Sequence, residues 1–168
     1  MERTICTKLV AISLVATVLA SCQTAEQRLQ ETRGGVGMPP DAMLLASQVQ
    51  ARQGSQDACY FTTLFELYGT DLSIEDVIDF YSTRLSQDWK EYSPPWLTEA
   101  DAYAVFRRDN AFQVSIDEAL PEEIDLFGDD TRATAQPHAT VYFVTWTYAD
   151  ADAQRNCPVW QTESDDQP

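Results

Sequence analysis

Basic residues are scarce in this 168-residue chain, which has 11 Lys and Arg against 27 Asp and Glu and a formal net charge of −16. Proteins that bind nucleic acid need a basic surface for the phosphate backbone. The adjacent basic pair Arg107-Arg108 falls within a predicted strand whose neighbours are not basic. We therefore expect no nucleic-acid partner. The acidity is typical of solubility in an exposed compartment, with a salt-rich habitat or cation binding as alternatives.

Catalytic motifs are also missing. The sequence contains no G-x-S-x-G, H-E-x-x-H, P-loop or dinucleotide-binding fingerprint. His138 is the only histidine, and no spacing places a nucleophile beside it, so we expect a surface or capping histidine. The sequence predicts neither an enzyme nor a cofactor.

An acidic stretch, 117–137, is the one candidate for metal binding. Its carboxylates lack the alternating spacing and the bidentate Glu of an EF-hand loop. We expect a solvated loop and no metal site, with Ca²⁺ binding as the alternative. The acids in question are Asp117, Glu118, Glu122, Glu123, Asp125, Asp129 and Asp130.

A hydrophobic run long enough to span a membrane is absent near the N-terminus. The apolar segment Leu9–Leu19 is shorter than the roughly 20 residues that a spanning helix needs, and Arg3 and Lys8 precede it. This arrangement predicts a signal peptide over residues 1–21.

The signal peptide ends in Leu19-Ala20-Ser21-Cys22, which resembles the lipobox of bacterial lipoproteins at all four places. The resemblance implies that Cys22 becomes the lipidated N-terminal residue and that its acyl chains, palmitate among them, attach the protein to a membrane. Gln23 then favours the outer membrane, facing the periplasm, if the cell is Gram-negative. An ordinary secretory signal with a chance cysteine is the alternative.

The remaining chain is long enough for one domain. Residues 22–37 lack an apolar stripe and end in glycines, which predicts a flexible tether. A single α+β domain is expected over 38–160, followed by an acidic tail over 161–168. Near the start of the domain, Met43, Leu44, Leu45 and Val49 are able to reach a core.

The segment 69–89 predicts a helix. Ser73 is a plausible N-cap, with Asp76 three residues later and a hydrophobic staple between Leu72 and Val77. Apolar residues then follow one helical stripe, which needs a surface to pack on. The stripe consists of Ile74, Val77, Ile78, Tyr81 and Leu85.

Strand-forming residues dominate on both sides of this helix. We expect strands over 59–69, 102–108, 112–116 and 140–148, with a hairpin turn at Asp109-Asn110. Pro121 starts a short helix. The predicted fold is α+β, an antiparallel sheet of about four to five strands with one principal helix packed on one face.

Four cysteines reduce to two once Cys6 is cleaved away and Cys22 is lipidated. In an exported domain the remaining pair, Cys59 and Cys157, suggests a disulfide. Antiparallel pairing of the first and last long strands would bring both to the same end of the sheet.

The order of these segments resembles a diffuse family of small exported bacterial domains, often lipoproteins. The resemblance covers roughly 38–148, and Asp88 stands where that pattern has Gly. It implies an α+β sheet with one principal helix, and no activity. The matching residues are Val77, Ile78, Phe80, Tyr81, Leu85 and Trp89.

Three classes of function therefore remain. The first is a lipid-anchored, non-catalytic envelope module for protein interaction or support, the second a module that binds a small ligand, glycan or Ca²⁺, and the third an enzyme. An exposed aromatic sheet face would favour the first two, but we expect a core built on both faces, with the exposed face as the alternative. The aromatic residues concerned are Tyr60, Tyr68, Tyr142, Trp146 and Tyr148.

Overall fold

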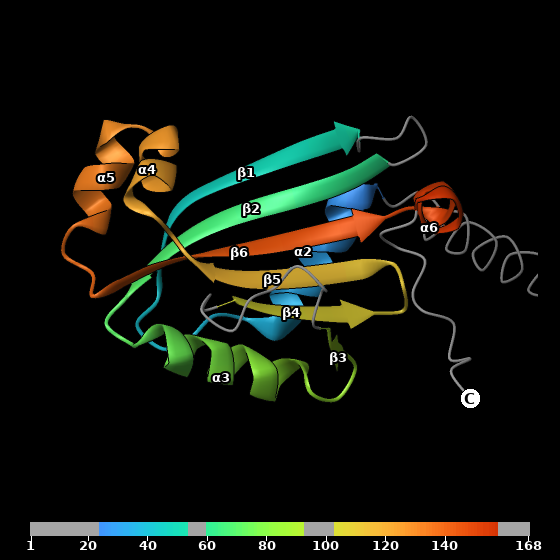
Figure 1. The fold of residues 1–168 in the computed structure, drawn as a ribbon, viewed down its shortest axis with the longest axis horizontal. Coiled ribbons are helices and arrows are strands. Elements are labelled where there is room, and N and C mark those ends of the chain that lie inside the picture. Colours follow the sequence, from blue (N-terminus) through green and yellow to red (C-terminus); the bar gives the residue numbers. More distant parts are fainter. Residues whose placement is uncertain (1–23, 54–59, 93–102, 158–168) are drawn as a thin grey trace, which may run out of the picture.

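The structure is a computed structural model that describes residues 24–53, 60–92 and 103–157. One antiparallel sheet forms its centre, with the strand order β1-β2-β6-β5-β4-β3 (Figure 1). The strands are β1 (Met43–Gln53), β2 (Tyr60–Thr70), β3 (Lys90–Glu91), β4 (Tyr103–Arg108), β5 (Phe112–Glu118) and β6 (Thr140–Ala149). The predicted α+β class and antiparallel sheet are confirmed, with six strands instead of four to five.

The two central strands are β2 and β6. They pair antiparallel from Phe61 opposite Ala149 to Thr70 opposite Thr140, which is the pairing that the predicted disulfide requires. Because side chains alternate along a strand, Leu64, Glu66 and Tyr68 share one face of the sheet with Tyr142, Val144 and Trp146. This face, which we call the helix face, carries the main core.

Helix α3 (Ile74–Leu85) packs on the helix face, as predicted. Ser73 is its N-cap, and the Ser73 hydroxyl accepts a hydrogen bond from the backbone N–H of Asp76. Val77, Tyr81 and Leu85 are fully buried, while Glu75 is exposed. The apolar stripe therefore faces the sheet, which is the arrangement that its spacing requires.

Helix α2 (Ala25–Val36) occupies the segment for which the sequence predicted a flexible tether. Thr24 caps it through a capping box with Gln27. The helix lies on the helix face, and its one buried apolar side chain, Leu29, is 1% exposed. Like α3 it has 12 residues, so two helices share the face on which one principal helix was expected.

Strand β1 forms one edge of the sheet. The expectation that Met43, Leu44 and Val49 reach the core is wrong, because they are 42%, 42% and 38% exposed. Among the described strands only β2 pairs with β1, so apolar residues on β1 have a neighbouring strand on one side alone. A register shift between Leu44 and Ala46 marks a bulge near its start.

The β4–β5 hairpin is confirmed. Asp109 and Asn110 at its turn have φ angles of 54° and 52°, the left-handed conformation that tight hairpin turns need and that Asp and Asn adopt more readily than most residues.

Two short helical regions cover the ends of the opposite face. Helix α6 (Ala151–Asn156) follows β6 directly, and its Ala153 packs with Ala149 and Phe61. At the other end, α4 (Pro121–Ile124), the 3-10 helix η1 (Asp125–Phe127) and α5 (Asp129–Ala135) connect β5 to β6. Phe127 of η1 lies 5.9 Å from Phe143, centroid to centroid. We call residues 120–136 the acidic lobe.

Candidate functional site

The most prominent polar group in the core is the carboxylate of Glu66, which is 3% exposed in the middle of β2. Trp146 donates its indole N–H to Oε2 at 3.0 Å. Arg33 of α2 lies with its Nε 3.0 Å from Oε1 and 3.2 Å from Oε2. The buried carboxylate is therefore both hydrogen-bonded and balanced by a cation, the two conditions under which a buried charge is tolerated.

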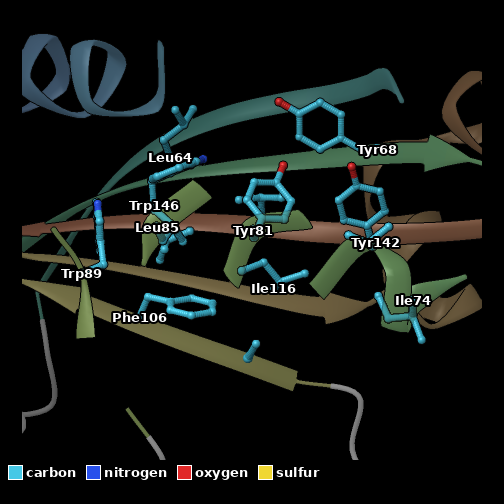
Figure 2. Close-up of a cluster of buried hydrophobic side chains, with 14 of the residues drawn as sticks. Leu64, Tyr68, Ile74, Tyr81, Leu85, Trp89, Phe106, Ile116, Tyr142 and Trp146 are labelled. Carbon is cyan, nitrogen blue, oxygen red and sulfur yellow. The ribbon is translucent and has the colours of Figure 1, made fainter. Parts of the chain in front are cut away.

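Three tyrosines surround this ion pair. Arg33 also donates to the Tyr68 hydroxyl at 3.0 Å, and the Tyr68 ring stacks on Tyr142 with centroids 5.5 Å apart. Figure 2 shows the hydroxyl groups of Tyr68, Tyr81 and Tyr142 on the same side of the core cluster. The three come from β2, α3 and β6, so the cluster joins both helices to the central strands.

Burial determines the protonation of these hydroxyl groups. Loss of hydration raises the pKa of Tyr68 to about 12, although the hydrogen bond from Arg33 acts in the opposite direction. Burial also raises the pKa values of Tyr81 and Tyr142 well above that of a free tyrosine. The hydrogen bond to Tyr68, together with the charge of Glu66, raises the pKa of Arg33. At neutral pH the tyrosine hydroxyl groups are therefore protonated and neutral, and Arg33 is charged.

This arrangement fixes the position of α2. The Arg33 side chain is 31% exposed and the Glu66 side chain 4%, so removal of Arg33 would leave an unbalanced buried charge, which typically costs about 3–5 kcal/mol. Two further bonds join α2 to the sheet, from Arg28 to the Tyr148 hydroxyl at 3.3 Å and from Arg108 to the Thr32 hydroxyl at 3.2 Å. The cluster therefore attaches helix α2 to the sheet.

The sequence offered one signal for this cluster, a single Glu within an aromatic strand. Arg33 could not be recognised as its partner, because 33 residues separate them and the segment around Arg33 has no apolar stripe.

The structure rules out the alternative of an exposed aromatic platform for three of the five aromatic residues. Tyr68, Tyr142 and Trp146 are 2%, 0% and 1% exposed beneath α2 and α3. Tyr148 is half-buried beside Phe112 and the Arg28 guanidinium, and the side chain of Tyr60 lies outside the described residues. The aromatic face is the one that the helices need for packing, so it is not exposed.

Two of the predicted site residues, Cys22 and Cys59, lie outside the described residues. The predicted signal peptide 1–21 and the acidic tail 161–168 lie outside them too. Cys157 is described. It is 2% exposed and packs with Ala149, Ala153 and Phe61. Phe61 is two residues after Cys59 in sequence, and it lies at the predicted end of the sheet. The Cys59 to Cys157 disulfide stays a prediction.

His138 packs over a glycine of β2. A Cβ atom built on Gly69 would lie 2.3 Å from Cδ2 of His138, so the imidazole ring occupies the space that any larger residue at 69 would fill. His138 Nε2 is buried without a hydrogen-bond partner among the described residues. This is a packing position, and the ring covers the start of β6 beside the end of β2.

The acidic lobe is the most unusual part of the described surface. Leu126 on η1 is 84% exposed and Leu120 is 54% exposed. The lobe is nevertheless ordered by local contacts, because Arg132 forms an ion pair with Asp125 at 2.6 Å and Glu123 accepts the backbone N–H of Leu120 at 2.9 Å. Within the lobe, Ile124 and Phe127 are half-buried, but Leu120 is exposed.

Within the described residues, no group of three or more His, Cys, Asp or Glu side chains is placed to hold a metal ion. The helices described there are all too short or too polar to cross a membrane.

Comparison with protein families, curated proteins and solved structures gives no match.

Proposed function

We propose that this chain is a lipid-anchored module of the bacterial cell envelope that acts through contact with another protein, or supports one, and not through catalysis. The lipobox Leu19-Ala20-Ser21-Cys22 carries this proposal. One residue, Gln23, separates Cys22 from Thr24, the N-cap of a helix that belongs to the fold. The lipidated cysteine would therefore be attached directly to the domain, in the outer membrane if the cell is Gram-negative.

The exposed leucines of the acidic lobe support an interaction role. Leu120 and Leu126 are exposed apolar side chains on a helical insertion that also carries acidic residues. Protein contacts commonly combine exposed apolar side chains with a polar rim. The partner that fits is a protein with an apolar pocket bordered by Lys or Arg.

The lipid anchor is tested with Cys22→Ser in cells supplied with labelled palmitate. Wild-type protein should take up label and fractionate with membranes, and Cys22→Ser should do neither, because the thiol that receives the lipid is gone. Ser21→Gly is the matched control, since it keeps a small residue before the cysteine. Unlabelled wild-type protein would refute the anchor.

The protein contact is tested separately by photocrosslinking in cells. A photoreactive residue at Leu126 should give a discrete adduct, whereas the same residue at the exposed Gln87, just after α3, should not. Equal crosslinking at both positions, or none at 126, would refute the lobe as a contact surface.

A further inference from the structure

Helix α2 begins at a defined end of the sheet. Arg28, in its first turn, reaches Tyr148 near the end of β6, whereas Arg33 reaches Glu66 and Tyr68 farther along β2. Helix α6 follows β6 at the same end (Figure 1). The N-terminus of α2 therefore lies at the same end of the sheet as α6, on the other face. We call this the α6 end of the sheet.

The acidic lobe lies at the opposite end, because it connects the end of β5 to the start of β6 (Figure 1). Strand β6 has ten residues, and at about 3.3 Å per residue it separates the two ends by about 30 Å. The N-terminus of α3 is also on the lobe side, since it follows the end of β2.

The connection between Cys22 and α2 is short. Gln23 is the one residue between Cys22 and the N-cap Thr24, and a residue spans at most about 3.6 Å. A flexible tether would let the domain rotate freely above a membrane. A helix held by Leu29 and the Arg33–Glu66 ion pair does not allow that freedom.

The charges of the two ends differ. The lobe carries the carboxylates of Glu122, Glu123, Asp125, Asp129 and Asp130 against the single cation of Arg132. At the α6 end, Arg28 and Arg155 offset part of the charge of Glu26, Asp150 and Asp152. An anionic lipid surface acts over about one Debye length, roughly 8–10 Å. Counting the described residues alone, it therefore repels the lobe end more strongly than the α6 end.

From these observations we propose that the α6 end of the sheet is the membrane-facing surface and that the docked α2 holds the acidic lobe away from the lipid. The inference rests on the proposed lipidation of Cys22. In this orientation the α6 end faces the lipid bilayer. The lobe, with Leu126, then points away from the membrane, toward possible protein partners.

The test uses the full lipidated protein in vesicles of phosphatidylethanolamine and phosphatidylglycerol that contain a headgroup-labelled acceptor lipid. A donor fluorophore is attached at Ala151→Cys in α6 or at Ala133→Cys in α5, both exposed positions. Wild-type protein treated in the same way gives the background labelling. Energy transfer to the acceptor lipid should be severalfold stronger from 151 than from 133.

Undocking α2 supplies the matched control. Leu29→Asp together with Arg33→Ala should remove much of the difference in energy transfer between donors at 151 and 133, because the domain then rotates on a free segment. Circular dichroism checks that the sheet of this variant remains folded. Flotation of the vesicles is measured in parallel. Protein that does not float would overturn both the lipid anchor and this orientation, whereas protein that floats with equal transfer from both positions would overturn the orientation alone.

Discussion

Gly69→Ala is the substitution whose effect follows most directly from the structure. The new Cβ atom would lie 2.3 Å from Cδ2 and 2.5 Å from Cγ of His138, whereas ordinary contacts are 3.4–4 Å. The ring cannot avoid the overlap by turning its tip, because Cγ is its point of attachment. Overpacking of this kind costs about 1–3 kcal/mol, and replacing a strand glycine returns about 0.5–1 kcal/mol. We expect a net loss of about 1–2 kcal/mol in the free energy of unfolding.

The assay is urea denaturation of the soluble chain from Gln23 onward, which keeps α2. A double-mutant cycle with His138→Ala isolates the contact. With the ring removed, Gly69→Ala should be neutral or stabilising. Gly34→Ala, in α2 and with nothing within 4 Å of its Cβ position, should stabilise by up to about 1 kcal/mol. A Gly69→Ala loss that persists in the His138→Ala background would refute the packing described here.

Three further outcomes are expected. Val77→Ala should lower the free energy of unfolding by about 1–3 kcal/mol and Glu75→Ala by at most about 1 kcal/mol, since the first is buried and the second exposed; equal urea midpoints would contradict this. The predicted Cys59 to Cys157 disulfide closes a loop on the order of 100 residues and contributes roughly 4–5 kcal/mol, and two reactive thiols in the denatured, unreduced protein would exclude it. Burial raises the pKa of Tyr68 from 10.0 to about 12, so the unfolded chain loses the hydroxyl proton at a lower pH than the folded chain does. The free energy of unfolding should therefore be constant below about pH 10 and fall as the pH rises through 12. Urea melts should show a shallower fall for Tyr68→Phe.

The predictable parts of the fold were those with a strong period. Helix α3 has a complete stripe and cap, and β2 and β6 are rich in aromatic and β-branched residues, so local pattern and tertiary environment agree. Strand β1 was not recognised because its exposed apolar residues do not alternate with buried ones. An edge strand is defined by its pairing with β2, and the sequence does not show which strand lies beside it.

Helix α2 and the Glu66 cluster were missed for a related reason. The helix has one buried apolar residue, Leu29, and two glycines in its last turn. Its position comes from Arg33 and Arg28, whose partners lie far away in sequence. Contacts of this kind leave no periodic trace, so residues 22–37 resemble a tether when they are considered alone.

Strand β1 has a consequence for a protein confined to a surface. Its regular part, from Ala46 to Gln53, contains one charged residue, Arg52, and no proline. Charged residues and prolines are among the features that prevent edge strands from pairing with other chains. Lipid anchoring would concentrate the molecules in two dimensions, where encounters between edges become frequent. The excess of Asp and Glu over Lys and Arg would then keep neighbouring molecules apart by electrostatic repulsion. Salt screens that repulsion, so ionic strength would control how closely these domains crowd on the membrane.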